Sequence, residues 1–124
     1  MIYLLDISAL VALLLGEHEF NARVTAWANG KTLAVCPFTE LGFLRVAMSA
    51  YKATPEQARK TLVDFQRSDR PRFLAADISV LTGEPFPSLN KSTDWYIANL
   101  AMKHGMKWAT TDAKANHPAA VVII

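Results

Sequence analysis

The sequence contains a single cysteine, Cys36, so no internal disulfide can form. A chain without disulfides is typical of a reducing compartment, and we expect a cytoplasmic location. Cys36 ends the apolar run that begins at Leu33. A free cysteine in such a run usually behaves as a small buried hydrophobic residue. We therefore expect a structural thiol here and no nucleophile.

Long apolar runs and a large net charge are also missing. The run Leu10–Leu15 is far shorter than the roughly 20 residues that a membrane-spanning helix needs. The first residues carry no basic stretch and already reach an acid at Asp6, which argues against a secretory signal peptide. Thirteen basic and eleven acidic residues leave a net charge of only +2, so bulk charge does not indicate a nucleic-acid partner. With no repeat or interdomain linker, we expect one domain over residues 1–124 and no membrane segment.

Apolar residues make up 52% of the chain, enough to build a buried core. Short apolar runs typical of strands alternate with longer segments typical of helices, which indicates a parallel sheet with helices on both faces. We predict an α/β fold, a three-layer α/β/α sandwich around a mostly parallel sheet of about five strands. The expected strands cover 2–5, 32–36, 73–76, 106–110 and 121–124, and the expected helices cover 8–15, 19–28, 39–51, 55–68 and 93–103, with a loop over 81–91.

Four acidic residues stand where a predicted strand ends or a predicted helix begins: Asp6, Glu40, Asp94 and Asp112. Taken singly, each has a structural explanation, because acids cap helices, suit their first turn and occur in turns. The first and fourth strands are expected to lie side by side where the strand order reverses, which brings Asp6 and Asp112 together. Converging carboxylates repel one another unless a cation neutralises them, and such hard oxygen ligands suit Mg²⁺ or Mn²⁺. The four acids together therefore indicate metal-dependent phosphodiester chemistry.

Basic residues crowd the middle of the chain, apart from the four acids. A basic zone beside an acidic site is what an enzyme acting on a polyanion needs. For any single Lys or Arg, a solvated helix face is the simpler explanation. The residues of this zone are Arg45, Lys52, Arg59, Lys60, Arg67, Arg70 and Arg72.

Four short motifs resemble those of a known family in their order and spacing. They are Leu5–Leu10 (LDISAL), Thr39–Val46 (TELGFLRV), Thr93–Ala98 (TDWYIA) and Ala109–Asp112 (ATTD). The sequence resembles the PIN-domain ribonucleases, in particular the VapC-type toxins of bacterial and archaeal toxin–antitoxin pairs, over nearly its whole length.

The resemblance implies a catalytic quartet that binds Mg²⁺ or Mn²⁺, formed by Asp6, Glu40, Asp94 and Asp112. Ser8, together with Thr110 or Thr111, matches small hydroxyl residues beside the acids of the family. Asn116 stands where some relatives carry a further acid, so a site that depends on a fifth carboxylate is not expected.

The same resemblance implies an endoribonuclease that leaves a 5′-phosphate and a 3′-hydroxyl, with structured RNA such as tRNA or ribosomal RNA as substrate. VapC-type toxins usually form homodimers and are held inactive by a VapB-like antitoxin, so both are expected partners. Apolar residues such as Phe43 and Leu44 are expected to offer surface to that antitoxin. Arg45 is a candidate contact for an RNA phosphate or for an acid of the antitoxin. Trp27, Trp95 and Trp108 are expected in the core or at an interface, and Trp95, beside Asp94, is the only one whose stacking on a base, or contact with the antitoxin, merits a test.

Three alternative functional classes fit the sequence less well. A metal-free nuclease with paired imidazoles finds no support in the spacing of His18, His104 and His117. A phospho-accepting receiver domain would need a paired acid after the first strand, where this chain has Asp6 alone. A non-catalytic PIN-like module with a vestigial site, binding RNA or protein, has no use for four mutually repelling acids.

Overall fold

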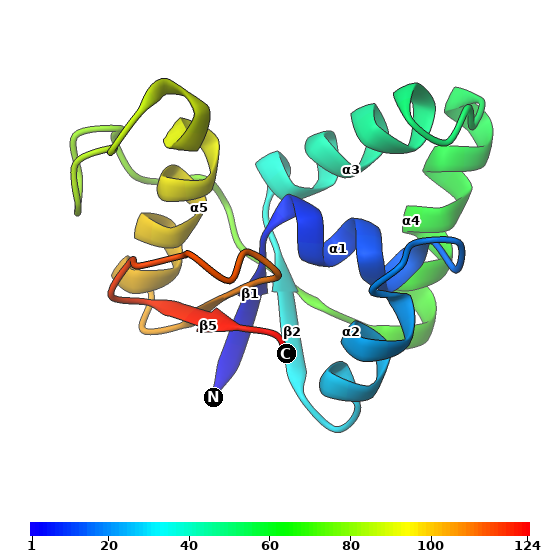
Figure 1. Ribbon diagram of the computed structural model, residues 1–124, viewed down its shortest axis with the longest axis horizontal. Helices are drawn as coiled ribbons and strands as arrows, with labels where there is room; N and C mark the ends of the chain where they lie inside the picture. The colour runs from blue at the N-terminus through cyan, green and yellow to red at the C-terminus, as the bar shows by residue number, and fades with distance from the viewer.

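A computed structural model describes all 124 residues and shows a five-stranded sheet with helices on both faces (Figure 1). The strands are parallel throughout and lie in the order β3-β2-β1-β4-β5. The predicted α/β/α sandwich is confirmed. The strands are β1 (Ile2–Leu5), β2 (Thr32–Val35), β3 (Arg72–Phe73), β4 (Lys107–Thr110) and β5 (Ala120–Val122). The helices are α1 (Ile7–Leu14), α2 (Asn21–Ala28), α3 (Pro37–Ser49), α4 (Pro55–Asp69) and α5 (Ser92–Lys103), with a short 3-10 helix η1 (Leu89–Lys91).

The strands are apolar on both faces because each face supports a separate core. Leu5 packs among residues of α1, α2, α3 and α4. Leu4, one residue earlier, packs with Trp108 and the apolar side of α5. Figure 1 shows the same division, with α5 on one side of the sheet and α1 to α4 on the other. This explains why the strands are continuous apolar runs and do not alternate with polar residues.

Local signals in the sequence position the helix ends. The capping box that opens α4 is present, since Gln57 N donates to Thr54 Oγ1 at 3.1 Å and Thr54 N donates to Gln57 Oε1 at 2.9 Å. α2 and α5 end as predicted, each followed by a glycine with positive φ, Gly30 and Gly105. α3 begins at Pro37, two residues earlier than predicted, because proline is well suited to the first position of a helix as well as to ending a strand.

The chain departs from the prediction most clearly at the sheet edge. β3 comprises Arg72 and Phe73 only, not residues 73–76, and residues 74–88 form a long connection that leads to η1. Cys36 is fully buried, with its Sγ 3.3 Å from Thr39 Oγ1, which confirms a structural thiol. None of the helices combines the length and apolar character needed to cross a membrane.

Candidate active site

The carboxyl ends of β1 and β4 form the point at which the strand order reverses. Asp6 directly follows β1, and its amide donates to Ala109 O in β4 at 3.0 Å. Asp112 lies two residues beyond β4, and Asp94 lies in the first turn of α5. The prediction that the first and fourth strands are neighbours is confirmed. In open α/β sheets this crevice is the usual ligand site.

Asp6 is almost completely buried and forms no salt bridge. It caps α1, because its Oδ1 accepts the amide hydrogen of Ala9 at 2.6 Å and the hydroxyl hydrogen of Ser8 at 2.9 Å. Burial raises the pKa of Asp6 to about 6. The Thr110 hydroxyl, the Ala9 amide and the Ser8 hydroxyl act in the opposite direction, and the charge of Asp94 raises the pKa further. Asp6 is therefore a helix cap, and it is also a carboxylate whose charge is incompletely compensated.

The three hydroxyl residues singled out in the sequence surround Asp6. Ser8 Oγ lies 2.8 Å from Thr111 Oγ1, so a side-chain hydrogen bond joins the start of α1 to the end of β4. Thr110 is fully buried, and its Oγ1 accepts the amide hydrogen of Asp112 at 3.1 Å. These contacts fix the positions of Asp6 and Asp112 relative to each other.

One lysine that was not predicted from the sequence lies among three carboxylates. Lys91 Nζ is 2.7 Å from Asp112 Oδ2, and this contact lowers the pKa of Asp112. Burial raises the pKa of Asp94, the charge of Lys91 lowers it and the charge of Asp112 raises it. The pKa of Lys91 is raised in turn, first by its hydrogen bond to Asp112 and then by the charges of Asp112, Asp94 and Asp6. Asp6, Asp94 and Asp112 are thus within electrostatic reach of one ammonium group.

Lys91 gives no signal of its own in the sequence, because the helix expected over 93–103 would place Ser92 at its N-cap. In the structure Lys91 occupies the N-cap position of α5, where the positive end of the helix dipole disfavours a cation. A lysine at that position needs a compensating acid nearby, and Asp112 supplies it.

Glu40 does not join the other three acids. Its Oε2 accepts a hydrogen bond from Gln66 Nε2 of α4 at 3.2 Å, and it lines a small cavity with Leu44 and Arg59. Burial raises the pKa of Glu40 and the Gln66 contact lowers it, without a contribution from the other acids. α3 packs against α4, so the donor on α4 holds this side chain away from the sheet edge. The structure brings together three of the four predicted acids.

The oxygen ligands fit a hard divalent cation, although they do not form a ready-made cage. No group of three His, Cys, Asp or Glu side chains is close enough to hold a metal ion as it stands. Mg²⁺ does not require such a group, because it keeps several waters and is usually bound by one or two carboxylates and substrate phosphates. The ammonium of Lys91 shows that a cation is favourable among Asp6, Asp94 and Asp112.

The predicted contact residues have different outcomes. Trp95 is 6% exposed and makes edge contacts with Trp108 and His117, at centroid distances of 5.8 and 5.7 Å. Its ring faces the sheet, which confirms the expected core position and leaves no face for stacking on a base. Arg45 is exposed on α3 and forms no salt bridge. Phe43 is fully buried in the core, so it offers no surface to a partner.

Sequence and structure comparisons agree with this description. The chain matches the family model of the PIN domain over residues 3–121. It is 36% identical over 121 residues to Ribonuclease VapC38 of Mycobacterium tuberculosis (strain ATCC 25618 / H37Rv), covering 89% of this chain and 84% of the relative. It is 28% identical over 120 residues to Ribonuclease VapC44 of Mycobacterium tuberculosis (strain CDC 1551 / Oshkosh), covering 88% and 84%.

A solved structure shares the fold. It is that of VapBC2 from Rickettsia felis bound to a DNA fragment from their promoter, with a TM-score of 0.65 over 98% of this chain and 97% of that chain. At 15% sequence identity this likeness shows the fold alone. The family match and the 36% identity show more, and the chain therefore belongs to the PIN-domain family and, within it, to the VapC-type proteins.

Proposed function

We propose that this protein is a metal-dependent endoribonuclease and the toxin of a VapBC-type toxin–antitoxin pair, acting in the cytoplasm. Membership of the family supports the nuclease activity. The observation that carries the proposal is the convergence of Asp6, Asp94 and Asp112 where β1 and β4 end. A buried acid without a salt bridge is costly, and such groups are concentrated at functional sites.

Asp6, Asp94 and Asp112 would hold Mg²⁺ or Mn²⁺. When bound, the ion would neutralise the carboxylates, attract a phosphate oxygen and make water a better nucleophile. Water adds to phosphorus, and the bond from phosphorus to the 3′ oxygen breaks. The products are a 5′-phosphate and a 3′-hydroxyl. Within the chain, the Ala9 amide and the hydroxyls of Ser8 and Thr110 favour the ionised form of Asp6. Thr111 would support the site through Ser8, and Glu40 would contribute after releasing Gln66.

The expected partners are an RNA substrate such as tRNA or ribosomal RNA, a VapB-like antitoxin and a second copy of the chain. Three leucines leave more than half of their surface exposed: Leu41 at 53%, Leu81 at 90% and Leu89 at 88%. Such exposed apolar side chains are available for contact with another protein. The exposed guanidinium of Arg45 is available to an RNA phosphate or to an acid of the antitoxin.

A non-catalytic module is the second candidate. It is favoured by one observation, the hydrogen bond that holds Glu40 on Gln66 and away from the other acids. Against it stands the burial of Asp6, since asparagine would cap α1 equally well without an acid whose pKa is raised to about 6.

The test is cleavage of total RNA by the wild type and by Asp6→Asn, each with Mg²⁺, Mn²⁺ or EDTA. We expect discrete cuts by the wild type only, lost in EDTA. Asp64→Asn is the matched control, because Asp64 is an exposed acid paired with Lys60 on α4. Cleavage fragments should be degraded by a 5′-phosphate-dependent exonuclease. Equal behaviour of the wild type and Asp6→Asn would favour the non-catalytic module.

A further inference from the structure

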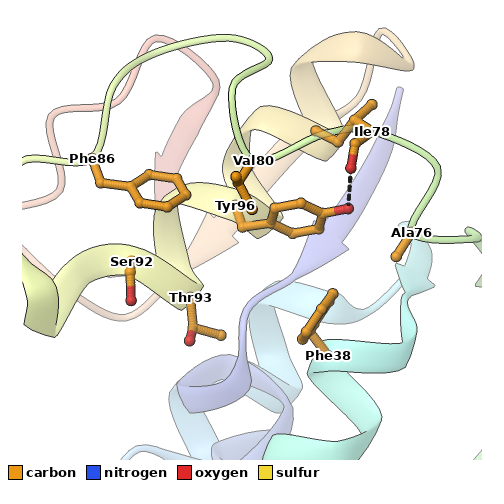
Figure 2. A pocket seen from close by; sticks show the side chains of 8 residues that line it. All are labelled: Phe38, Ala76, Ile78, Val80, Phe86, Ser92, Thr93 and Tyr96. Carbon is orange, nitrogen blue, oxygen red and sulfur yellow. Dashed lines mark hydrogen bonds between the residues drawn. The ribbon is translucent and has the colours of Figure 1, made fainter.

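A cavity of about 370 Å³ lies beside the candidate active site, between the start of α3, the connection over residues 74–88 and the first turns of α5. Figure 2 shows its lining: Phe86 points into it from the connection, Phe38 from α3 and Tyr96 from α5. Ser92 and Thr93 line it from the first turn of α5, in which Asp94 is the next residue. Its volume lies within the roughly 300–1,000 Å³ of small-ligand pockets.

The lining selects a flat, uncharged ligand with a polar edge. It carries no charged side chain, which makes it unsuitable for a phosphate, but it includes three aromatic rings. Phe38 is 40% exposed and meets Tyr96 edge to face, with a centroid distance of 5.0 Å. The Thr93 hydroxyl is exposed and makes no hydrogen bond within the chain, so it can serve a ligand as donor or acceptor. Aromatic faces with a free hydroxyl suit a nucleobase, which stacks and offers a hydrogen-bonding edge.

The cavity is held in shape by contacts that have no part in the acid cluster. The Tyr96 hydroxyl donates to Ile78 O at 2.7 Å (Figure 2). Farther along the connection, the Asn99 side chain accepts from Glu84 N at 3.0 Å and donates to Glu84 O at 2.9 Å. His117 Nε2 lies 2.8 Å from Asn99 Oδ1 and fixes this amide from behind. A connection fastened at two points gives a preformed pocket, and preformed pockets bind ligands at a lower entropic cost.

We propose that this cavity binds one unpaired base of the RNA, on a nucleotide next to the cleaved phosphate. The inference rests on the proposed ribonuclease function and deepens it. The backbone of the RNA lies over Asp94 and its neighbours, and the adjacent base enters between Phe38 and Phe86. Stacking supplies affinity for any base, and the Thr93 hydroxyl selects among bases.

The experiment uses Asp6→Asn protein, which we expect to bind RNA without cutting it, in Mg²⁺ buffer. The probes are short single-stranded RNA oligonucleotides with one 2-aminopurine at successive positions, whose fluorescence falls when the base stacks. We expect one position to be strongly quenched. Two further substitutions are made separately in the Asp6→Asn protein. Phe38→Ala removes a ring at the rim, and Val80→Trp places a larger side chain in the cavity at a position that is 62% exposed. Both should abolish the quenching and weaken affinity about tenfold, the range expected for one stacked base.

The control is Phe73→Ala, which removes an aromatic ring that is 60% exposed on β3 and does not line the cavity. It should leave quenching and affinity unchanged. Thr93→Val should keep the quenching and change the preferred base at that position in cleavage by otherwise wild-type protein. Thermal melts of each variant verify folding.

Three results would overturn the inference. Wild type that cleaves RNA, with quenching unaffected by Phe38→Ala and Val80→Trp, would remove the base pocket and leave the ribonuclease standing. Unchanged RNA binding combined with weakened binding of purified cognate antitoxin would assign the cavity to a protein side chain. Failure of the wild type to cut RNA and of Asp6→Asn to bind it would remove both the function and the pocket.

Discussion

The structural role of Asp6 and its proposed catalytic role make opposite demands on its surroundings. As the cap of α1 it must be buried against the amide of Ala9. As the proposed metal ligand it would have to remain ionised. A pKa of about 6, against an ordinary value of 3.8, corresponds to a cost of about 3 kcal/mol for the buried charge at neutral pH. The metal-free protein therefore carries a local instability that a bound cation would relieve.

Replacing Asp6 by Asn should stabilise the metal-free protein. Asparagine caps helices as well as aspartate does, so the hydrogen bond from Ala9 is retained without the buried charge. We expect the free energy of unfolding in EDTA at pH 8 to rise by about 2–3 kcal/mol, measured by urea denaturation. Added Mg²⁺ should stabilise the wild type more than Asp6→Asn.

The pH dependence of this gain has a defined sign. Because folding raises the pKa of Asp6, its protonated form favours the folded state below pH 3.8, and this contribution is lost as the pH rises through about 6. The advantage of Asp6→Asn should be small at pH 4 and complete above pH 7. An advantage that is equal at pH 4 and pH 8 would show that the buried charge is not its cause.

Lys91 should compete with a divalent cation for the same carboxylates. Its ammonium lies 2.7 Å from Asp112 and is partly exposed, at 40%. Lys91→Met should tighten Mn²⁺ binding about three- to fivefold, in keeping with the small energies of partly exposed ion pairs. Mn²⁺ binding is measured by electron paramagnetic resonance, without reference to activity.

Lys114→Met controls for net charge in that measurement, because Lys114 also lies near Asp112 but forms no salt bridge. Equal effects of the two substitutions would show that only overall charge matters.

The sequence could predict which acids lie at the meeting strand and helix ends, but not how each side chain is oriented. Asp6, Asp94 and Asp112 follow from their places at strand and helix ends, because parallel strands bring those ends together. The hydrogen bond between Glu40 and Gln66 joins residues 26 positions apart on two helices, and no local pattern in either helix predicts it. For a similar reason the sequence left base stacking by Trp95 open, whereas in the structure its ring faces the sheet.

At the scale of elements, the order of strands and helices was predictable because periodicity and caps are local properties. The edge strand was not. The extent of β3 is set by its pairing with β2, in which Arg72 pairs with Ala34 and Phe73 pairs with Val35. An apolar pattern within β3 itself does not set it. The connection after β3 was predicted in part as a loop, but its attachment to α5 depends on Asn99, a polar residue buried inside an otherwise apolar helix face.

Asn99 should therefore control the order of that connection. Asn99→Ala removes both hydrogen bonds to Glu84 and leaves Nε2 of the buried His117 without its partner. We expect a loss of about 2–4 kcal/mol in the free energy of unfolding, since each unsatisfied buried group costs about 1–3 kcal/mol. Limited proteolysis of the folded variant should cut within residues 79–88.

The matched control for Asn99→Ala is Ser49→Ala, which removes an exposed hydrogen bond to Arg45 O and should change stability little. Proteolysis of Asn99→Ala at the same rate and positions as the wild type would show that other contacts hold the connection.

At the scale of the whole molecule, the two cores share every central strand. Leu4 belongs to the core beneath α5 and Leu5 to the core beneath α1, and the same alternation recurs in β4 between Trp108 and Ala109. Neither core can lose its packing without disrupting strands that also support the other core. This is the physical reason to expect one cooperative unit over residues 1–124 despite two separate apolar clusters.

Tryptophan positions allow that expectation to be tested on both sides of the sheet. Trp27, in edge contact with Tyr3 at 5.2 Å, reports on the side of α2, whereas Trp95 and Trp108 report on the side of α5. In Trp27→Phe the remaining fluorescence follows the α5 side, and in Trp95→Phe combined with Trp108→Phe it follows the α2 side. Within each variant, urea unfolding followed by fluorescence should coincide with unfolding followed by far-ultraviolet circular dichroism. Because the two signals are compared within one variant, the effect of the substitutions on stability does not influence the result. If the urea midpoints from fluorescence and circular dichroism differed in either variant, one face of the sheet could lose its packing while the strands persist.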